Sequence, residues 1–256
     1  MTGPRTHDET CAPSGGAGQF TLPIHYRDGT VASLVYPISR ERAEAALEGT
    51  SLRPVQVPKV GCVASITWFE YGATSIGPYN ELSVSVAARL GSEHRAGSLL
   101  DWARGRFEVG GWVVSLPVDS EVARVGGVEL LGLPKCTLEL SSKISASSLS
   151  VEVKDGGRSI SALQVHKKRG IRLSVHRIVI YSKRSGSLLR TTIKTSWRPE
   201  LALPGQSAWR PEAPDHPLVE ATSALGVEGK PLAIIHGSGF EAWLPEPEIL
   251  DLPAHR

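Results

Sequence analysis

Apolar and polar residues alternate over short stretches through most of the chain after residue 20. Successive side chains of a β-strand point to opposite faces, so this alternation is typical of strands with one buried side. Gly, Pro, Asp and Ser residues separate the stretches and favour turns. Strands are predicted over residues 31–36, 63–71, 81–90, 107–116, 148–153, 159–165, 171–181, 188–197, 232–235 and 240–244.

Two of the connections have the composition of hairpin turns. The sequence Asp155-Gly156-Gly157 joins two alternating stretches, and residues 182–187 join the next pair. Residues 199–217 are rich in proline, and we expect an ordered excursion there and not a linker between domains.

Apolar residues recur with helical spacing in two segments. The first covers residues 40–48 and follows a capping serine. The second begins after Asp119 or Ser120 and ends at Gly132, with its apolar residues three positions apart: Val122, Val125, Val128 and Leu131. This second helix would lead the chain directly to Lys135 at the start of a strand.

Many short strands with only two helices predict a mainly β protein. An antiparallel sheet closed into a barrel is favoured because closure removes exposed edges, although the pattern alone does not exclude a sandwich. A chain of 256 residues can form one such unit. We expect residues 19–256 to be a single domain and residues 1–18, which have no apolar core, to be mobile.

Composition excludes several classes of partner. The formal net charge is +2, from 28 basic and 26 acidic residues, which gives no electrostatic reason to expect nucleic acid or an anionic membrane. The three cysteines lack paired spacing and the eight histidines do not cluster, so neither a disulfide framework nor a metal centre is expected. A reducing cytoplasm fits this pattern.

Lys135 follows a mostly apolar run, residues 126–134. A protonated lysine is a poor nucleophile, and burial disfavours the charged form of an amine. A lysine enclosed by such residues is therefore a candidate for imine formation with a ketone. The alternative is a surface lysine immediately after a helix.

Two segments, taken together, resemble the acetoacetate decarboxylase family, whose activated lysine is the established example of this chemistry. Residues 120–129, leading into Gly132-Leu133-Pro134-Lys135, resemble the family's approach to its Schiff-base lysine. The segment Ser75-Ile76-Gly77-Pro78-Tyr79-Asn80-Glu81-Leu82 resembles the one that carries an active-site glutamate. The resemblance covers roughly residues 20–245 and implies a cone-like β-barrel with a few short helices that associates into dimers or larger homo-oligomers.

The same resemblance implies that Lys135 and Glu81 are catalytic. Alternation places Glu81 on the polar face of its strand, with Ser83 and Ser85. In a closed barrel that face can line a cavity, whereas in an open sheet it would be a solvated surface.

Arg27 and Tyr79 are the substrate-binding residues that the resemblance implies. Arg27 roughly matches a family arginine that engages the substrate carboxylate, and a guanidinium suits a planar carboxylate because it donates two parallel hydrogen bonds. The competing interpretation of Arg27 is a surface residue in a Tyr-Arg-Asp-Gly turn.

The sequence departs from the family pattern at two positions. The decarboxylases carry a second lysine directly after the catalytic one, where this chain has Cys136. They also carry an upstream glutamate on the strand that here includes residues 63–67, which contain no acid; Glu70 comes several residues later. These changes alter the groups around the substrate and put acetoacetate itself in doubt.

The resemblance predicts a cofactor-independent carbon–carbon lyase that forms an imine with a keto acid. Decarboxylation of a β-keto acid is the leading reaction. Aldolase, dehydratase or cyclase chemistry through the same lysine, in a biosynthetic pathway, is the alternative. A barrel that has lost catalysis and only binds a small molecule is a third interpretation.

Overall fold

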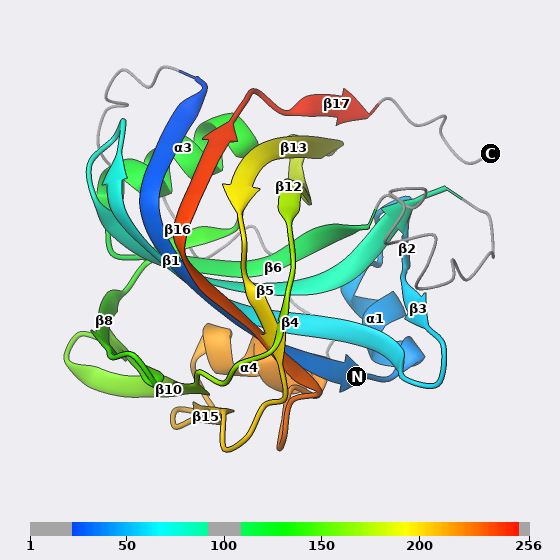
Figure 1. Ribbon diagram of the computed structural model, residues 1–256. Helices are drawn as coiled ribbons and strands as arrows, with labels where there is room; N and C mark the ends of the chain where they lie inside the picture. Colours follow the sequence, from blue (N-terminus) through cyan, green and yellow to red (C-terminus); the bar gives the residue numbers. More distant parts are fainter. Residues whose placement is uncertain (1–21, 92–108, 251–256) are drawn as a thin grey trace.

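Seven strands close into a barrel in the computed structural model, which describes residues 22–91 and 109–250 (Figure 1). Each strand pairs with the next around the ring, and the last pairs with the first. The ring order is β16 (Ala233–Leu244), β1 (Ile24–Ile38), β4 (Gly61–Thr74), β5 (Tyr79–Leu90), β6 (Gly110–Val118), β12 (Val175–Arg184) and β13 (Ser187–Trp197). The β-rich barrel predicted from the sequence is confirmed.

One pair in the ring is not antiparallel as the sequence analysis predicted. Strands β6 and β12 run parallel, with Gly110 opposite Val179 and Trp112 opposite Tyr181. Parallel neighbours require a long crossover connection. Here the connection leaves the barrel after β6 and contains helix α3 (Glu121–Leu131), strand β7 (Lys135–Thr137) and most of a second sheet.

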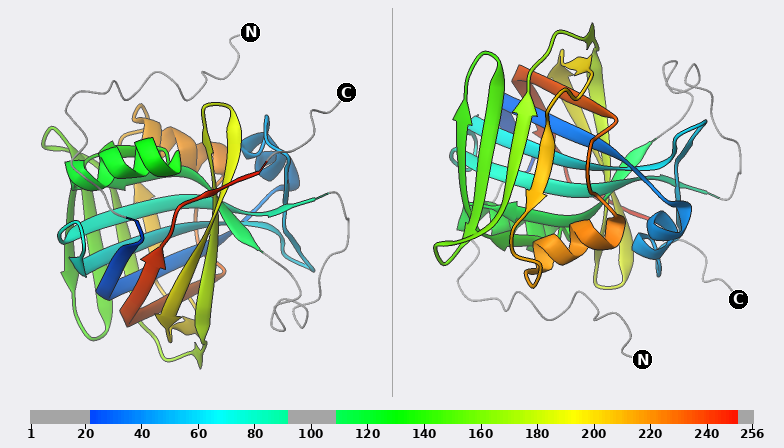
Figure 2. Two further views of the ribbon diagram at one scale, coloured as in Figure 1. Left: turned by 90° about the horizontal axis from the view of Figure 1, so that it is seen from above. Right: turned by 90° about the horizontal axis from the view of Figure 1, so that it is seen from below.

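The second sheet stands beside the barrel (Figure 2). It consists of β8 (Glu139–Ile144), β9 (Ser148–Asp155), β10 (Arg158–His166) and β15 (Ala208–Pro211). The β9–β10 hairpin turns at Gly156 and Gly157 as predicted, and both glycines have positive φ. An apolar core joins this sheet to the outer face of the barrel and includes Leu34, Ile66, Leu149, Val151 and Leu163.

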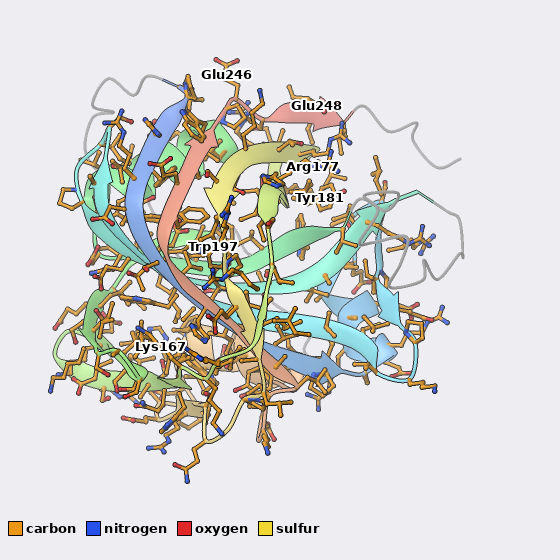
Figure 3. The ribbon with its side chains drawn as sticks, viewed as in Figure 1. Lys167, Arg177, Tyr181, Trp197, Glu246 and Glu248 are labelled. Carbon is orange, nitrogen blue, oxygen red and sulfur yellow. The ribbon has the colours of Figure 1, made fainter. Side chains whose placement is uncertain are left out.

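The barrel interior holds a separate apolar cluster. Trp197 of β13, labelled in Figure 3, lies where this strand meets β16 and closes the ring. Its ring packs edge-on against Phe240 of β16, with ring centroids 5.6 Å apart. Helix α3 also contributes to this cluster through Ala123 and Leu131. The interior is therefore a packed core that α3 helps to complete.

Short strands extend the main sheet at its margins. Strand β2 (Leu52–Pro54) pairs with β5 and β3 (Gln56–Val57) with β4. Strands β11 (Ile171–Arg172) and β14 (Glu200–Ala202) extend the sheet from β16, and β17 (Glu248–Leu250) pairs with β13. The single strand predicted over residues 171–181 is thus divided into β11 and β12, whereas the two predicted over 232–235 and 240–244 form one continuous strand.

Of the three helices among the described residues, two agree with the sequence analysis. Helix α1 (Arg40–Ala46) begins after Ser39, whose hydroxyl accepts the Arg42 N–H, and ends two residues earlier than predicted. Helix α4 (Pro217–Leu225) was not predicted, although His216 caps it and Gly226 ends it in the left-handed conformation. The mobile segment expected at residues 1–18 lies outside the described residues, and the single domain over 19–256 stays a prediction.

Candidate active site

Helix α3 delivers Lys135 in the way its sequence predicts. The Ser120 hydroxyl accepts the Ala123 N–H at 3.3 Å and starts the helix. Gly132 adopts the left-handed conformation, with φ of 59°, and ends it. The chain then turns so that the Leu133 N–H donates to the Gly127 carbonyl, and Lys135 begins β7 beside Leu116 of β6.

Lys135 and Glu81 form a buried contact. The Lys135 Nζ atom lies 2.7 Å from Glu81 Oε2, and the two side chains are 5% and 10% exposed. No other charged residue of the described chain is as buried as either. Burying a charge is costly, and a buried ion pair contributes little net stability, so such a pair is a candidate for function.

The stem of Lys135 lies against helix α3 at a glycine. A β-carbon built on Gly127 would lie 2.6 Å from Lys135 Cε and still closer to Cδ. Only a residue without a side chain allows the lysine to pass here. Gly127 belongs to the motif that resembles the family, but the sequence alone did not indicate that it makes room for the Lys135 side chain.

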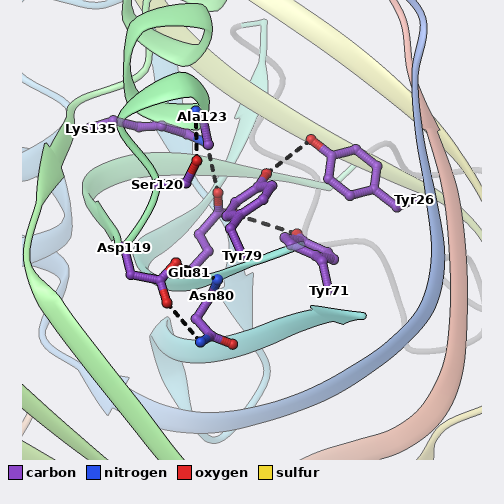
Figure 4. Close-up of polar contacts among 9 residues, drawn as sticks. All are labelled: Tyr26, Tyr71, Tyr79, Asn80, Glu81, Asp119, Ser120, Ala123 and Lys135. Carbon is purple, nitrogen blue, oxygen red and sulfur yellow. Dashed lines mark hydrogen bonds and ion pairs between the residues drawn. The ribbon is translucent and has the colours of Figure 1, made fainter. Parts of the chain in front are cut away.

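Three buried tyrosines lie on one side of the Lys135–Glu81 pair (Figure 4). The Tyr71 hydroxyl donates to Glu81 Oε1 at 3.5 Å, and the hydroxyls of Tyr26 and Tyr79 lie 3.2 Å apart. The Tyr79 ring centroid is 5.4 Å from Lys135 Nζ, within the range of a cation–π contact. Neither Tyr26 nor Tyr71 was nominated from the sequence.

The tyrosines are electrically neutral donors in this setting. Burial is the largest cause that raises the pKa of Tyr26, Tyr71 and Tyr79, and the negative charge of Glu81 raises the pKa of each further. Their hydroxyl hydrogens therefore stay in place over the pH range in which enzymes work. They can donate hydrogen bonds but cannot serve as ready bases.

Asn80 and Asp119 fix the strand that carries Glu81. One carboxylate oxygen of Asp119 accepts the Asn80 backbone N–H and the other accepts its side-chain amide, both at 2.7 Å. This clamp joins the start of β5 to the end of β6, where the chain turns towards α3. It holds Tyr79 and Glu81, the two neighbours of Asn80, relative to the helix.

The polar face predicted for the Glu81 strand continues into the barrel. Ser83 is buried, and the Ser85 hydroxyl lies 2.9 Å from that of Ser65 on β4. The Thr67 hydroxyl lies 2.8 Å from that of Ser33 on β1. Hydroxyl groups on this face of the sheet thus pair with one another across neighbouring strands.

Comparison with known proteins decides the family. The sequence model of the family described as acetoacetate decarboxylase matches residues 10–175, more than half of the chain. The chain belongs to this family. No curated protein matches at a significant level.

Solved structures of acetoacetate decarboxylase-like proteins share the fold. Acetoacetate decarboxylase from Legionella pneumophila superposes with a TM-score of 0.62 at 15% identity, covering 95% of this chain and 93% of that one. An acetoacetate decarboxylase-like enzyme from Sphingomonas wittichii RW1 gives 0.62 at 13% identity, covering 90% and 94%. MppR, an enduracididine biosynthesis enzyme complexed with the condensation product of pyruvate and imidazole 4-carboxaldehyde, gives 0.60 at 14% identity and 97% coverage of both chains.

One residue that the resemblance to the acetoacetate decarboxylase family implied for substrate binding lies away from the others. Arg27 is exposed, and its Nε donates to His25 Nδ1 at 3.1 Å. Tyr26, the preceding residue on β1, is the one that points inward. The structure therefore brings Lys135, Glu81 and Tyr79 together and leaves Arg27 on the other face.

The two departures from the family pattern also have a structural setting. Cys136 is half-buried and packs against the core between the barrel and the second sheet. Glu70 accepts a hydrogen bond from Ser142 of the second sheet at 2.7 Å.

A surface pocket in the described part of the chain does not include the buried pair. The pocket, of about 640 Å³, is lined by residues that include Asp119, Thr137 and Lys154, but not by Lys135 or Glu81. Within residues 22–91 and 109–250, no three His, Cys, Asp or Glu side chains gather in a way that could hold a metal ion. The buried pair is the group with the clearest chemistry.

Proposed function

We propose that the protein is a cofactor-independent lyase that forms an imine between Lys135 and a keto acid, and that it decarboxylates a β-keto acid. The observation that carries this proposal is the 2.7 Å contact between Lys135 Nζ and Glu81 inside an apolar cluster. Membership of the acetoacetate decarboxylase family supports it. The longest helix among the described residues, α3, has 11 residues and is too short to span a membrane. A cytoplasmic location and a homo-oligomeric state are further parts of the proposal.

Glu81 is suited to activate Lys135. The carboxylate accepts the ammonium proton, and the neutral amine attacks the ketone carbon of the substrate. Loss of water gives an iminium ion. The bond to the carboxylate carbon then breaks, its electron pair flows into the iminium to form an enamine, and CO₂ leaves. Protonation of the enamine carbon and hydrolysis release the ketone and restore Lys135.

A second reaction has support from one neighbour. MppR, which shares the fold, was solved with a condensation product of pyruvate and an aldehyde. The iminium ion of pyruvate would instead lose a methyl proton to a base, and the resulting enamine could attack an aldehyde. Aldolase or dehydratase chemistry at Lys135 is therefore the alternative proposal.

Borohydride trapping tests the imine. The protein is incubated with acetoacetate, pyruvate and longer keto acids, then reduced with borohydride, and the adduct is located by peptide mass analysis. We expect a single adduct on Lys135 that Lys135→Met abolishes and that Lys143→Met, a control at an exposed lysine of β8, leaves intact. Adducts spread over surface lysines, or none on Lys135, would overturn the proposal.

The Lys135→Met variant needs its own control because it leaves the Glu81 charge buried without its partner. Removing one member of a buried pair costs about 3–5 kcal/mol. The double variant Lys135→Met/Glu81→Gln removes both charges. It should be more stable than the single variant Lys135→Met and should still fail to form the adduct. Release of CO₂ then distinguishes decarboxylation from condensation with an added aldehyde.

A further inference from the structure

We propose that the paired hydroxyls of Tyr26 and Tyr79 hold the carboxylate of the substrate beside Lys135, with Tyr79 as the direct contact and Tyr26 as the residue that positions it. This inference rests on the proposed imine chemistry. It assigns to the tyrosine pair the task that the sequence analysis gave to Arg27.

The two tyrosines come from different strands and meet next to the reactive amine. Tyr26 lies on β1 and Tyr79 on β5, and their hydroxyls are 3.2 Å apart (Figure 4). Both residues are buried, at 6% and 4% exposure. Because the Tyr79 ring lies over Lys135 Nζ, a substrate attached to that nitrogen would extend along the ring.

The Tyr26–Tyr79 pair has one hydroxyl hydrogen that is not used in the hydrogen bond between the two residues. Each hydroxyl carries one hydrogen, and the hydrogen bond between them uses one of the two. Tyr71 differs, since its hydroxyl already donates to Glu81. The remaining hydrogen of the Tyr26–Tyr79 pair can donate to a substrate oxygen, and a carboxylate oxygen is the stronger acceptor because it is charged.

The order of the two residues follows from which ring lies over the lysine nitrogen. The carboxylate carbon of a β-keto acid is two bonds away from the carbon that Lys135 attacks, so it remains near the ring that covers Nζ. Tyr79 is that ring. The Tyr26 hydroxyl lies one hydrogen bond further away, where donation to Tyr79 would orient the Tyr79 hydrogen towards the substrate.

Neutral donors suit a carboxylate that leaves as CO₂. The carboxylate loses its charge as the carbon–carbon bond breaks, so a guanidinium partner would stabilise the bound substrate more than the transition state. Neutral hydroxyls position the group and oppose its departure less. The pair therefore favours decarboxylation over a reaction that retains the carboxylate.

Two probes of similar shape test the inference. Acetoacetate carries the carboxylate, and 4-methylpentan-2-one carries an isopropyl group of nearly the same shape in its place. The concentration that gives half-maximal borohydride trapping on Lys135 is measured for both. Loss of a hydrogen bond to a charged group should raise this concentration for acetoacetate about 10-fold or more in Tyr79→Phe, and by a smaller factor in Tyr26→Phe.

The neutral ketone controls for structural damage. For 4-methylpentan-2-one we expect a clearly smaller increase than for acetoacetate in both variants, since the neutral ketone makes no hydrogen bond to the pair. Tyr36→Phe is the matched control: Tyr36 is a buried tyrosine on the same strand that accepts the Trp209 N–H and faces the other core. Tyr36→Phe should leave the half-maximal trapping concentration of both probes unchanged. If Tyr79→Phe does not fold, Tyr26→Phe decides the question.

The outcomes separate this inference from the function on which it rests. If neither probe, nor pyruvate nor any of the longer keto acids, forms an adduct on Lys135 of the unmodified protein, the imine proposal fails and this inference fails with it. If the neutral ketone is trapped and the ratio of the two probes is the same in all variants, only the tyrosine assignment fails. Trapping of the neutral ketone without acetoacetate would also overturn the assignment.

Discussion

Lys135 passes beneath Gly127 so closely that no β-carbon fits between them. Gly127 lies inside helix α3, next to Gly126, where glycine is less favourable than alanine by about 1 kcal/mol. The helix therefore carries a residue that weakens it locally. The benefit is that the lysine stem lies flat under the helix and the amine reaches Glu81.

Gly127→Ala should disturb the lysine despite improving helix propensity. The new methyl group would collide with Lys135 Cδ and Cε, so the side chain must move or the helix must shift. We expect a net loss of about 1–3 kcal/mol in the free energy of unfolding. Trapping of a keto acid on Lys135 should fall at least about 10-fold, because a shift of about 1 Å at a reacting group is costly. Denaturant unfolding and adduct yield measure the two effects.

Adding Gly127→Ala to a variant that lacks the lysine side chain tests whether the collision causes the loss of stability. In Lys135→Ala the colliding atoms are absent, so adding Gly127→Ala should no longer destabilise the protein. If Gly127→Ala lowers the free energy of unfolding as much in the Lys135→Ala variant, the collision with Lys135 does not explain why position 127 is a glycine.

Glu81→Gln should slow imine formation more than it weakens binding. The amide keeps the shape of the side chain but cannot take the ammonium proton of Lys135. A general base contributes about 10²–10⁴-fold, so the rate of adduct formation should fall by about 100-fold or more. Rapid quenching with borohydride at saturating keto acid measures the rate, and an unchanged rate would remove Glu81 from the mechanism.

Arg27→Met should leave the site unaffected. Arg27 is exposed and contacts His25 rather than the buried pair. We expect the half-maximal keto acid concentration for trapping to change less than about twofold, since surface substitutions away from a site have small effects. A large increase would restore Arg27 to the role in carboxylate binding that the sequence analysis gave it.

The tyrosines should make stability fall at alkaline pH. Burial raises the pKa of Tyr36 to about 12 and is the largest cause raising those of Tyr26, Tyr71 and Tyr79. In the unfolded chain these phenols ionise near pH 10. Above about pH 10 the unfolded state therefore holds fewer protons than the folded state, and stability decreases as pH rises.

Absorbance of phenolate after a pH jump checks this expectation. At about pH 11, between the unfolded and folded pKa values of Tyr36, the folded protein should show little immediate phenolate signal. The signal should then appear slowly, at the rate of unfolding. All five tyrosines of the chain are buried, so no exposed tyrosine contributes an early signal.

Local sequence signals predicted the elements that hold the lysine and the glutamate. Ser120 starts α3 and Gly132 ends it, as predicted, and the alternation placed Glu81 on the same face of its strand as Ser83 and Ser85. The motif resemblance linked Lys135 to Glu81. Each helix boundary and each of the two motifs involves residues close together in the sequence, which is why these features could be predicted.

The remaining parts depend on contacts between distant segments. Tyr26 could not be distinguished from Arg27 by alternation alone, because the pattern shows which residues share a face and not which face is enclosed. The parallel pairing of β6 with β12 follows from a crossover of more than fifty residues that no local signal reveals. Helix α4 was missed although His216, Pro217 and Gly226 mark its ends.

Closure of the barrel uses strands that lie beyond the lysine and the glutamate in the sequence. A fragment ending near residue 175 would retain Lys135, Glu81 and the tyrosines, but it would lack β12, β13 and β16. Strands β1 and β6 would then each expose a row of unpaired backbone groups, which recruit other chains. Such a fragment should self-associate, so the reactive groups alone do not make a usable minimal enzyme.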